Sequence, residues 1–76
     1  MKLREMKEGE RGIVTGFDPA ANPHYRRKLL RMGLMRNAAF CVVRKAPFGG
    51  PIEIEVKGFR LALRSNEADA FEVARK

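Results

Sequence analysis

The side chains that could bind a metal ion are few and far apart in this sequence. His24 is the only histidine and Cys41 is the only cysteine. The spacings Cys-x-x-Cys, His-x-x-His and His-Glu-x-x-His, which bring ligands together on one element, do not occur. We therefore expect His24 to be an exposed residue at a helix start and Cys41 to be a strand residue. The prediction is a chain that holds no metal and no cofactor of its own.

The residues that could act as a nucleophile, an acid or a base are equally isolated. Ser65 is the only serine, and no histidine lies near it in the sequence to serve as its base. Glu53 and Glu55 point the same way from one expected strand, where such a pair faces solvent. Gly49 and Gly50 lack the lysine and the Ser/Thr of a phosphate-binding loop. We expect a binding protein and not an enzyme.

Charge is the remaining chemical signal. The 76 residues carry a formal net charge of +7, from 16 Lys and Arg against 9 Asp and Glu. The excess lies in residues 19–52, which contain no acidic residue and the basic residues Arg26, Arg27, Lys28, Arg31, Arg36, Arg44 and Lys45. Such a segment favours an anionic partner, which could be nucleic acid, an acidic protein face or a membrane surface. The alternative is a solvated face that keeps the protein soluble.

Length and composition predict one small domain over residues 1–76. Hydrophobic residues make up 45% of the chain, which is typical of a globular protein. A lone cysteine provides no disulfide and is consistent with the reducing cytoplasm. The first ten residues lack the apolar stretch of a secretory signal, and the longest apolar run, residues 38–43, is far too short to span a bilayer.

Alternating apolar residues predict five short strands, at residues 13–17, 39–45, 52–56, 59–63 and 70–73. Lys57 and Gly58 predict a tight turn between the third and fourth strands, and residues 46–51 form a loop. By alternation, Phe59 and Phe71 are expected to be buried. Residues 66–69 resemble one helical turn capped by Asn66. Five strands in so short a chain leave open edges unless the sheet curls, so we predict a small, partly closed barrel.

One helix is expected between the first and second strands, over residues 24–32. We expect Asn22 to be its N-cap, Pro23 to be its first residue and Gly33 to be its C-terminal cap. Three apolar residues share the inward face at helical spacing, and three basic residues lie on the other side. The inward residues are Tyr25, Leu29 and Met32; the outward residues are Arg27, Lys28 and Arg31.

Leu30 and Leu34 do not fit the inward face of this helix. An exposed apolar pair rimmed by arginines suits a contact with another protein. Alternatively, the basic segment 24–45, with Tyr25 and Phe40 interleaved, suits single-stranded nucleic acid. This second reading is weakened by an aromatic content of only 8%.

The order of four motifs resembles the ferrous iron transport protein A family, FeoA. They are LREMKEGERGIV near the start, RRKLLRMGL in the expected helix, APFGGPIEIEVKGFRLALR over the expected hairpin, and EADAFEV near the end. Together they extend over almost the whole chain, from Leu3 to Val73. The resemblance implies a mainly β fold, an SH3-like β-barrel of about five strands with a short helix inserted between the first and second strands.

The resemblance also implies a function. It implies a small cytoplasmic accessory protein of ferrous iron uptake, without enzymatic activity, that contacts the membrane transporter FeoB; it does not imply iron ligands of its own. Self-association through an open sheet edge is a further possibility. The residues that the resemblance assigns to the partner surface are Arg27, Leu29, Leu30, Met32, Gly33 and Leu34.

One position departs from the family pattern, and two related barrels fit less well. Asn37 stands where the family usually has glycine, and asparagine tolerates a left-handed backbone better than most residues. The C-terminal domain of DtxR-type repressors has the same barrel, but this chain is too short to include their DNA-binding and dimerisation parts. Peptide-binding SH3 domains fit poorly, because the chain has no tryptophan.

Overall fold

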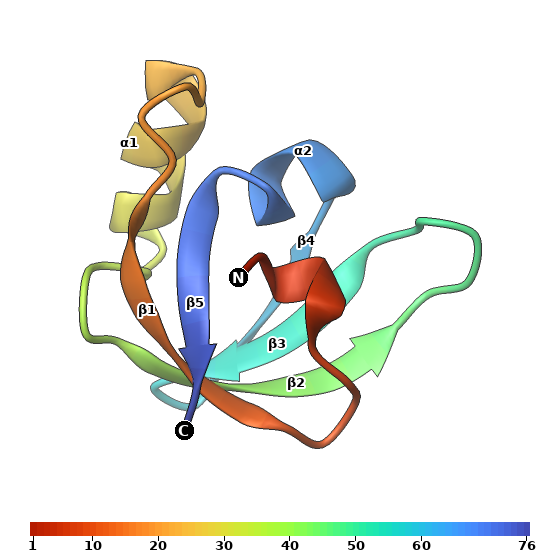
Figure 1. The fold of residues 1–76 in the computed structure, drawn as a ribbon. Coiled ribbons are helices and arrows are strands. Elements are labelled where there is room, and N and C mark those ends of the chain that lie inside the picture. The colour runs from red at the N-terminus through yellow and green to blue at the C-terminus, as the bar shows by residue number, and fades with distance from the viewer.

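A single antiparallel sheet of five strands forms the body of the molecule (Figure 1). The computed structural model describes residues 1–76. The strands lie side by side in the order β4-β3-β2-β1-β5. They are β1 (Arg11–Phe17), β2 (Ala39–Lys45), β3 (Ile52–Val56), β4 (Phe59–Leu63) and β5 (Phe71–Arg75). Three helical segments accompany them, η1 (Leu3–Glu5), α1 (Pro23–Arg31) and α2 (Ser65–Ala68). The predicted mainly β fold, with a helix between the first and second strands, is confirmed.

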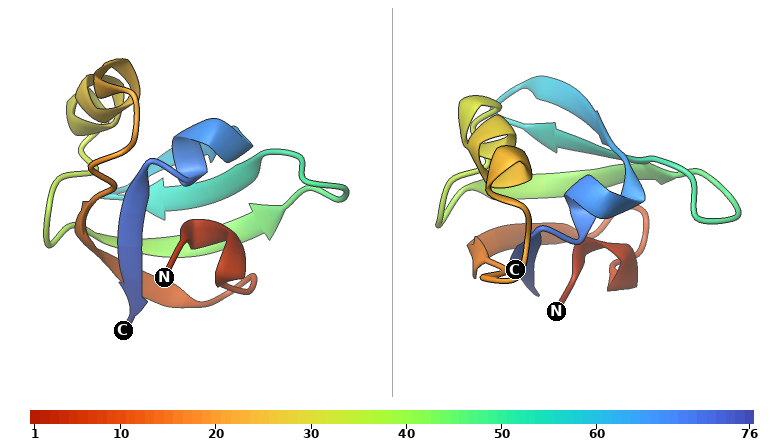
Figure 2. Two further views of the ribbon diagram at one scale, coloured as in Figure 1. Left: turned by 45° about the horizontal axis from the view of Figure 1, so that its top comes forward. Right: turned by 90° about the horizontal axis from the view of Figure 1, so that it is seen from above.

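The sheet curls because two of its strand pairs slip in register. One shift lies between Val14 and Gly16, where β1 pairs with β5, and the other between Val42 and Arg44, where β2 pairs with β3. An extra residue on one strand bends that strand and increases its twist. The bent strands wrap around the core, and β4 and β5 remain the two edges of the sheet (Figure 2).

The hydrophobic core lies on the concave side of the sheet and comprises 16 buried residues. Its strand residues follow the predicted alternation: Phe40 and Val42 of β2 are buried, and Phe71 of β5 is fully buried. Leu3, the first residue of η1, and Met6, directly after η1, are also fully buried. The N-terminal segment therefore completes the core, which so short a chain has few other residues to cover.

The prediction that Phe59 is buried was wrong, because its side chain is 70% exposed. It pairs with the buried Val56 beside the turn at Lys57 and Gly58, at one end of the sheet. At the other end of β4, Leu63 is fully buried. Alternation thus gives the side of the sheet on which a residue lies, but at this hairpin end the core covers Val56 of β3 and does not cover Phe59 on the edge strand β4.

The N-cap of the short helix α2 lies two residues earlier than predicted. Arg64 occupies the N-cap position that we expected of Asn66, and its N–H donates to the Glu67 carboxylate over 3.0 Å. The Asn66 side chain is engaged elsewhere, since its amide nitrogen donates to the Tyr25 hydroxyl over 2.6 Å. The carboxylate that closes this cap therefore comes from the third helical residue, as in one half of a capping box.

Asn37 adopts the left-handed backbone expected of the glycine it replaces, with φ of 73°. It lies in the turn that leads into β2, and its N–H donates to the Val14 carbonyl over 2.7 Å. We expect Asn37→Ala to lower the free energy of unfolding by about 1 kcal/mol, because alanine tolerates this conformation poorly. Asn37→Gly is the control and should cost nothing. Urea denaturation of both variants measures the difference; an equal cost would show that the turn does not require this conformation.

Candidate partner-binding surface

Helix α1 is fixed at both ends by signals in its own sequence. The Asn22 side chain accepts a hydrogen bond from the His24 N–H over 2.9 Å, and Pro23 is the first helical residue, as predicted. After the last helical residue, Arg31, the chain reverses at Gly33, which has φ of 92°. Only glycine adopts this conformation without strain, so the end of the helix is set by one residue.

The reversal at Gly33 explains why the prediction for Leu34 was wrong. The Leu34 N–H donates to the Leu29 carbonyl over 3.0 Å, and the Gly33 N–H donates to the Leu30 carbonyl over 3.1 Å. This pair of bonds is a Schellman motif, in which the residue after the glycine folds back toward the last turn of the helix. Leu34 is consequently fully buried, as is Leu29, and neither offers side-chain surface to a partner.

The inward side of α1 packs against the barrel as expected and is tied to α2 by polar contacts. Tyr25 and Met32 are partly buried against the core. Lys28 was predicted on the outward side, but its ammonium lies 2.5 Å from the carboxylate of Glu67. Glu67 is the only charged residue with a buried side chain. Two segments that are distant in the sequence are thus joined by one ion pair.

The environment of Glu67 favours its ionised form. Burial alone would raise its pKa, but the hydrogen bonds from Lys28 and from the Arg64 N–H outweigh it. The pKa of the Glu67 carboxyl is therefore held below its usual value. The group remains a carboxylate at neutral pH and holds α1 and α2 together.

The outward side of α1 exposes apolar surface among arginines. Leu30 is 38% exposed, and Met35, in the turn after the helix, is 47% exposed. Beside Leu30, a surface hollow of about 400 Å³ is lined in part by Phe17 and Arg36. We call the following residues the α1 surface: Arg26, Arg27, Leu30, Arg31, Met35 and Arg36. No carboxylate lies within 4.0 Å of the four arginines, so their charge is not neutralised by an ion pair.

The structure divides the six predicted partner-binding residues into three groups. Arg27 and Leu30 are exposed, Met32 and Gly33 are half-buried, and the other two are in the core. Sequence reasoning missed Met35 as an exposed apolar residue. The available signal was its position directly after the C-terminal cap, since a segment that buries one leucine there directs the neighbouring side chain outward.

The basic residues of segment 24–45 do not form one continuous face. Five of them lie on α1 or in the turn after it, whereas Arg44 and Lys45 lie at the far end of β2. Figure 1 shows α1 near the first end of β2, and the loop between β2 and β3 at the other end. A seven-residue strand separates the two groups by roughly 20 Å.

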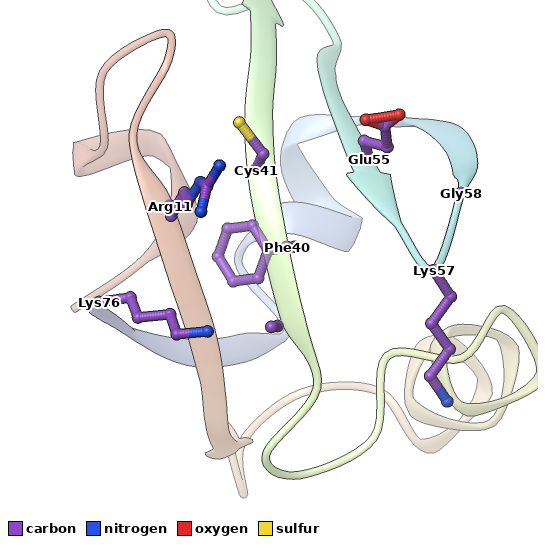
Figure 3. Close-up of a pocket in the computed structure, with 8 residues that line it drawn as sticks. Arg11, Phe40, Cys41, Glu55, Lys57, Gly58 and Lys76 are labelled. Atoms are coloured by element: carbon purple, nitrogen blue, oxygen red, sulfur yellow. The ribbon is translucent and has the colours of Figure 1, made fainter.

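A second hollow, of about 350 Å³, lies on the outer face of the sheet (Figure 3). Arg11, Cys41 and Glu55 approach it from β1, β2 and β3. Cys41 pairs with Glu55 across the strands, but the only histidine of the chain is on α1. The hollow therefore lacks a thiol–imidazole pair for nucleophilic catalysis.

No three His, Cys, Asp or Glu side chains come together in a group that could hold a metal ion. None of the helices has both the length and the apolar character needed to cross a bilayer.

A match to a protein-family model identifies the family of this chain. The model of the FeoA domain matches residues 1–75. The chain belongs to the FeoA family. Members of the FeoA family are small accessory proteins involved in ferrous iron uptake. The SH3-like fold that the sequence motifs implied is confirmed by the same match and by solved structures.

Solved structures of FeoA proteins superimpose on almost the entire chain. The FeoA protein of Chlorobium tepidum is 45% identical, with a TM-score of 0.86, over 99% of this chain and 70% of that protein. An iron uptake regulatory protein described as FeoA is 34% identical, with a TM-score of 0.84, over 100% of this chain and 96% of its own length. A manganese-dependent transcriptional repressor is 23% identical, with a TM-score of 0.89, over 99% of this chain and 36% of the repressor, and shares the fold alone.

Proposed function

We propose that this FeoA-family chain is a cytoplasmic accessory protein that contacts a FeoB-type ferrous iron transporter through the α1 surface. The observation that carries the proposal is the exposure of Leu30 and Met35 among four arginines without acidic partners. Apolar side chains surrounded by arginine are typical of the centre and rim of a protein interface.

The chemistry of the α1 surface specifies the partner's side of the contact. Leu30 and Met35 require an apolar recess, and the arginines around them require Asp or Glu at its edge. Leu29 and Leu34 support the surface from below, because they anchor the helix that presents it. Met32 and Gly33 set the direction in which the chain leaves α1, so a substitution at Gly33 would displace Met35.

Binding of single-stranded nucleic acid is the alternative, and the arrangement of charges argues against it. A strand-binding groove needs basic and aromatic side chains along one continuous track. Here the basic residues form two separate groups, and Phe40 is buried and so cannot stack on a base. We expect no retardation of RNA or DNA by the protein at low salt; retardation with a steep salt dependence would favour the alternative.

The test of the proposed contact is Leu30→Asp. The substitution places a carboxylate where the partner offers apolar and acidic groups, so affinity for the cytoplasmic region of the FeoB-type transporter should fall more than about tenfold. Ferrous iron uptake in a strain that lacks its own gene for this protein should not be restored. Because Leu30 is partly exposed, the variant should unfold at nearly the wild-type temperature.

Ala62→Asp is the matched control, since Ala62 is exposed on the sheet edge and lies outside the α1 surface. It should bind and restore uptake as the wild type does. Unchanged binding by a folded Leu30→Asp variant would exclude the α1 surface as the contact. Equal loss in both variants would mean that added negative charge, and not the position, is responsible.

A further inference from the structure

The loop between β2 and β3 carries a large side chain that the fold does not use. Phe48 is fully exposed at the tip of residues 46–51, which we call the Phe48 loop. Its backbone has φ of 59°, in the left-handed region where bulky residues are rare. Both the conformation and the contact of the ring with water are unfavourable in the isolated protein. The combination points to a partner that covers the ring.

The Phe48 loop is closed and narrow. The Ala46 N–H donates to the Pro51 carbonyl over 3.0 Å, and the Gly50 N–H donates to the Pro47 carbonyl over 3.2 Å. A Cβ atom at Gly50 would lie 2.8 Å from the Cβ of Ala46, so glycine is needed for the two arms to come this close. The loop therefore presents a single ring at the end of a slender projection.

Basic side chains stand beside the arms of the loop. Arg44, Lys45 and Arg64 each line a hollow that also includes residues of the Phe48 loop. None of the three forms an ion pair: Lys45 Nζ donates instead to the backbone carbonyls of Arg4 and Met6, over 2.6 and 3.0 Å. Arg44 and Arg64 are exposed and can contact an anionic partner, and Lys45 adds an unneutralised positive charge beside them.

The carboxylates near the loop do not cancel these charges. Asp69 is paired with Arg4, and Glu53 lies 3.4 Å from Arg60. Glu8 is near the base of the loop, where it accepts the backbone N–H of Lys45, and has no cationic side-chain partner. Three unpaired cations against one such carboxylate leave this end of the molecule positive.

We propose that the Phe48 loop inserts its aromatic ring into the interfacial layer of an anionic lipid bilayer, while Arg44 and Arg64 lie against the headgroups and the charge of Lys45 adds to the attraction. One ring on a narrow loop covers far less than the roughly 800 Å² that each partner contributes to a stable protein interface. A bilayer needs no matching shape, accepts aromatic rings at its interface and attracts basic residues. The proposal is separate from the transporter contact, because it involves the opposite end of β2.

The absence of tryptophan from the chain provides a direct test. Phe48→Trp places a single fluorophore at the loop tip, and Phe59→Trp places one at the start of β4, beside the other end of β3, as the matched control. With vesicles of phosphatidylcholine and phosphatidylserine, emission of Phe48→Trp should shift to shorter wavelength and be quenched by brominated acyl chains. Emission of Phe59→Trp should not change, and neither variant should respond to phosphatidylcholine alone.

Sedimentation with the same vesicles measures the strength of the contact. Phe48→Ala should lower the vesicle partition coefficient about tenfold, because most of the apolar ring is removed. Sedimentation without an emission shift of Phe48→Trp would mean that charge alone binds the protein, and would overturn the insertion. The proposal also fails if no vesicle binds, or if Phe48→Ala instead weakens binding to the transporter's cytoplasmic region in the absence of lipid.

Discussion

Replacing Leu34 by alanine is expected to lower the free energy of unfolding by about 3 kcal/mol. Leu34 is fully buried next to the last turn of α1, and truncation leaves a cavity where the helix joins the core. The matched variant is Leu30→Ala, which shortens the same side chain on the exposed side and should cost less than about 0.5 kcal/mol. Urea denaturation followed by circular dichroism measures both values.

The contrast between the two leucines tests the position of α1. If both variants lower the free energy of unfolding equally, α1 does not bury one leucine and expose the other as described. The α1 surface would then have to be defined again. If Leu34→Ala unfolds the domain completely, the milder Leu34→Val still reports the burial, with an expected cost of about 1 kcal/mol.

Replacing Glu67 by alanine should be the second large effect, with a loss of about 2 kcal/mol at neutral pH. The substitution removes the acceptor of the Arg64 N–H and leaves Lys28 without its partner. The exposure of Lys28 limits the cost, because water can solvate the released ammonium. Glu67→Gln retains an oxygen acceptor for the Arg64 N–H but loses the charge and the acceptor of Lys28, so it should be about half as costly.

The stability lost on substitution of Glu67 should decrease as the pH falls. The folded-state pKa of Glu67 is below its unfolded value of about 4.3, so the carboxylate stabilises the protein fully above that value. The stabilisation disappears as the pH falls through the lower, folded-state pKa. Unfolding free energies measured from pH 7 downward should therefore converge for the wild type and Glu67→Gln in acid. A difference that persists at low pH would assign the effect to packing and not to charge.

The local signals in the sequence were sufficient for most elements of the fold. Asn22 and Pro23 located the start of α1, and the turn at Lys57 and Gly58 located the hairpin, because each depends on backbone preferences within a few residues. The alternation in β2 identified which of its side chains enter the core. The left-handed backbone at Asn37 followed from the resemblance to a family that usually has glycine there, together with the tolerance of asparagine for positive φ.

The errors occurred where a local pattern stops applying or where a position depends on distant parts of the chain. Leu34 was misplaced because helical periodicity does not continue past Gly33, where the chain reverses. Phe59 was misplaced because alternation does not reveal where the core ends. The pairing of Lys28 with Glu67 joins α1 to α2, and no pattern in a single sequence indicates contacts between such distant residues.

Strand β2 lowers the affinity that each of the two contacts needs, because it connects them. It holds the α1 surface and the Phe48 loop on one rigid body, a fixed distance apart. Once one end is attached, the other searches only a small volume, at an effective concentration of about a millimolar. Two contacts that are each too weak to persist alone then give a long residence time together. Loss of either one would release the protein quickly, so residence at the membrane would depend on both contacts at once.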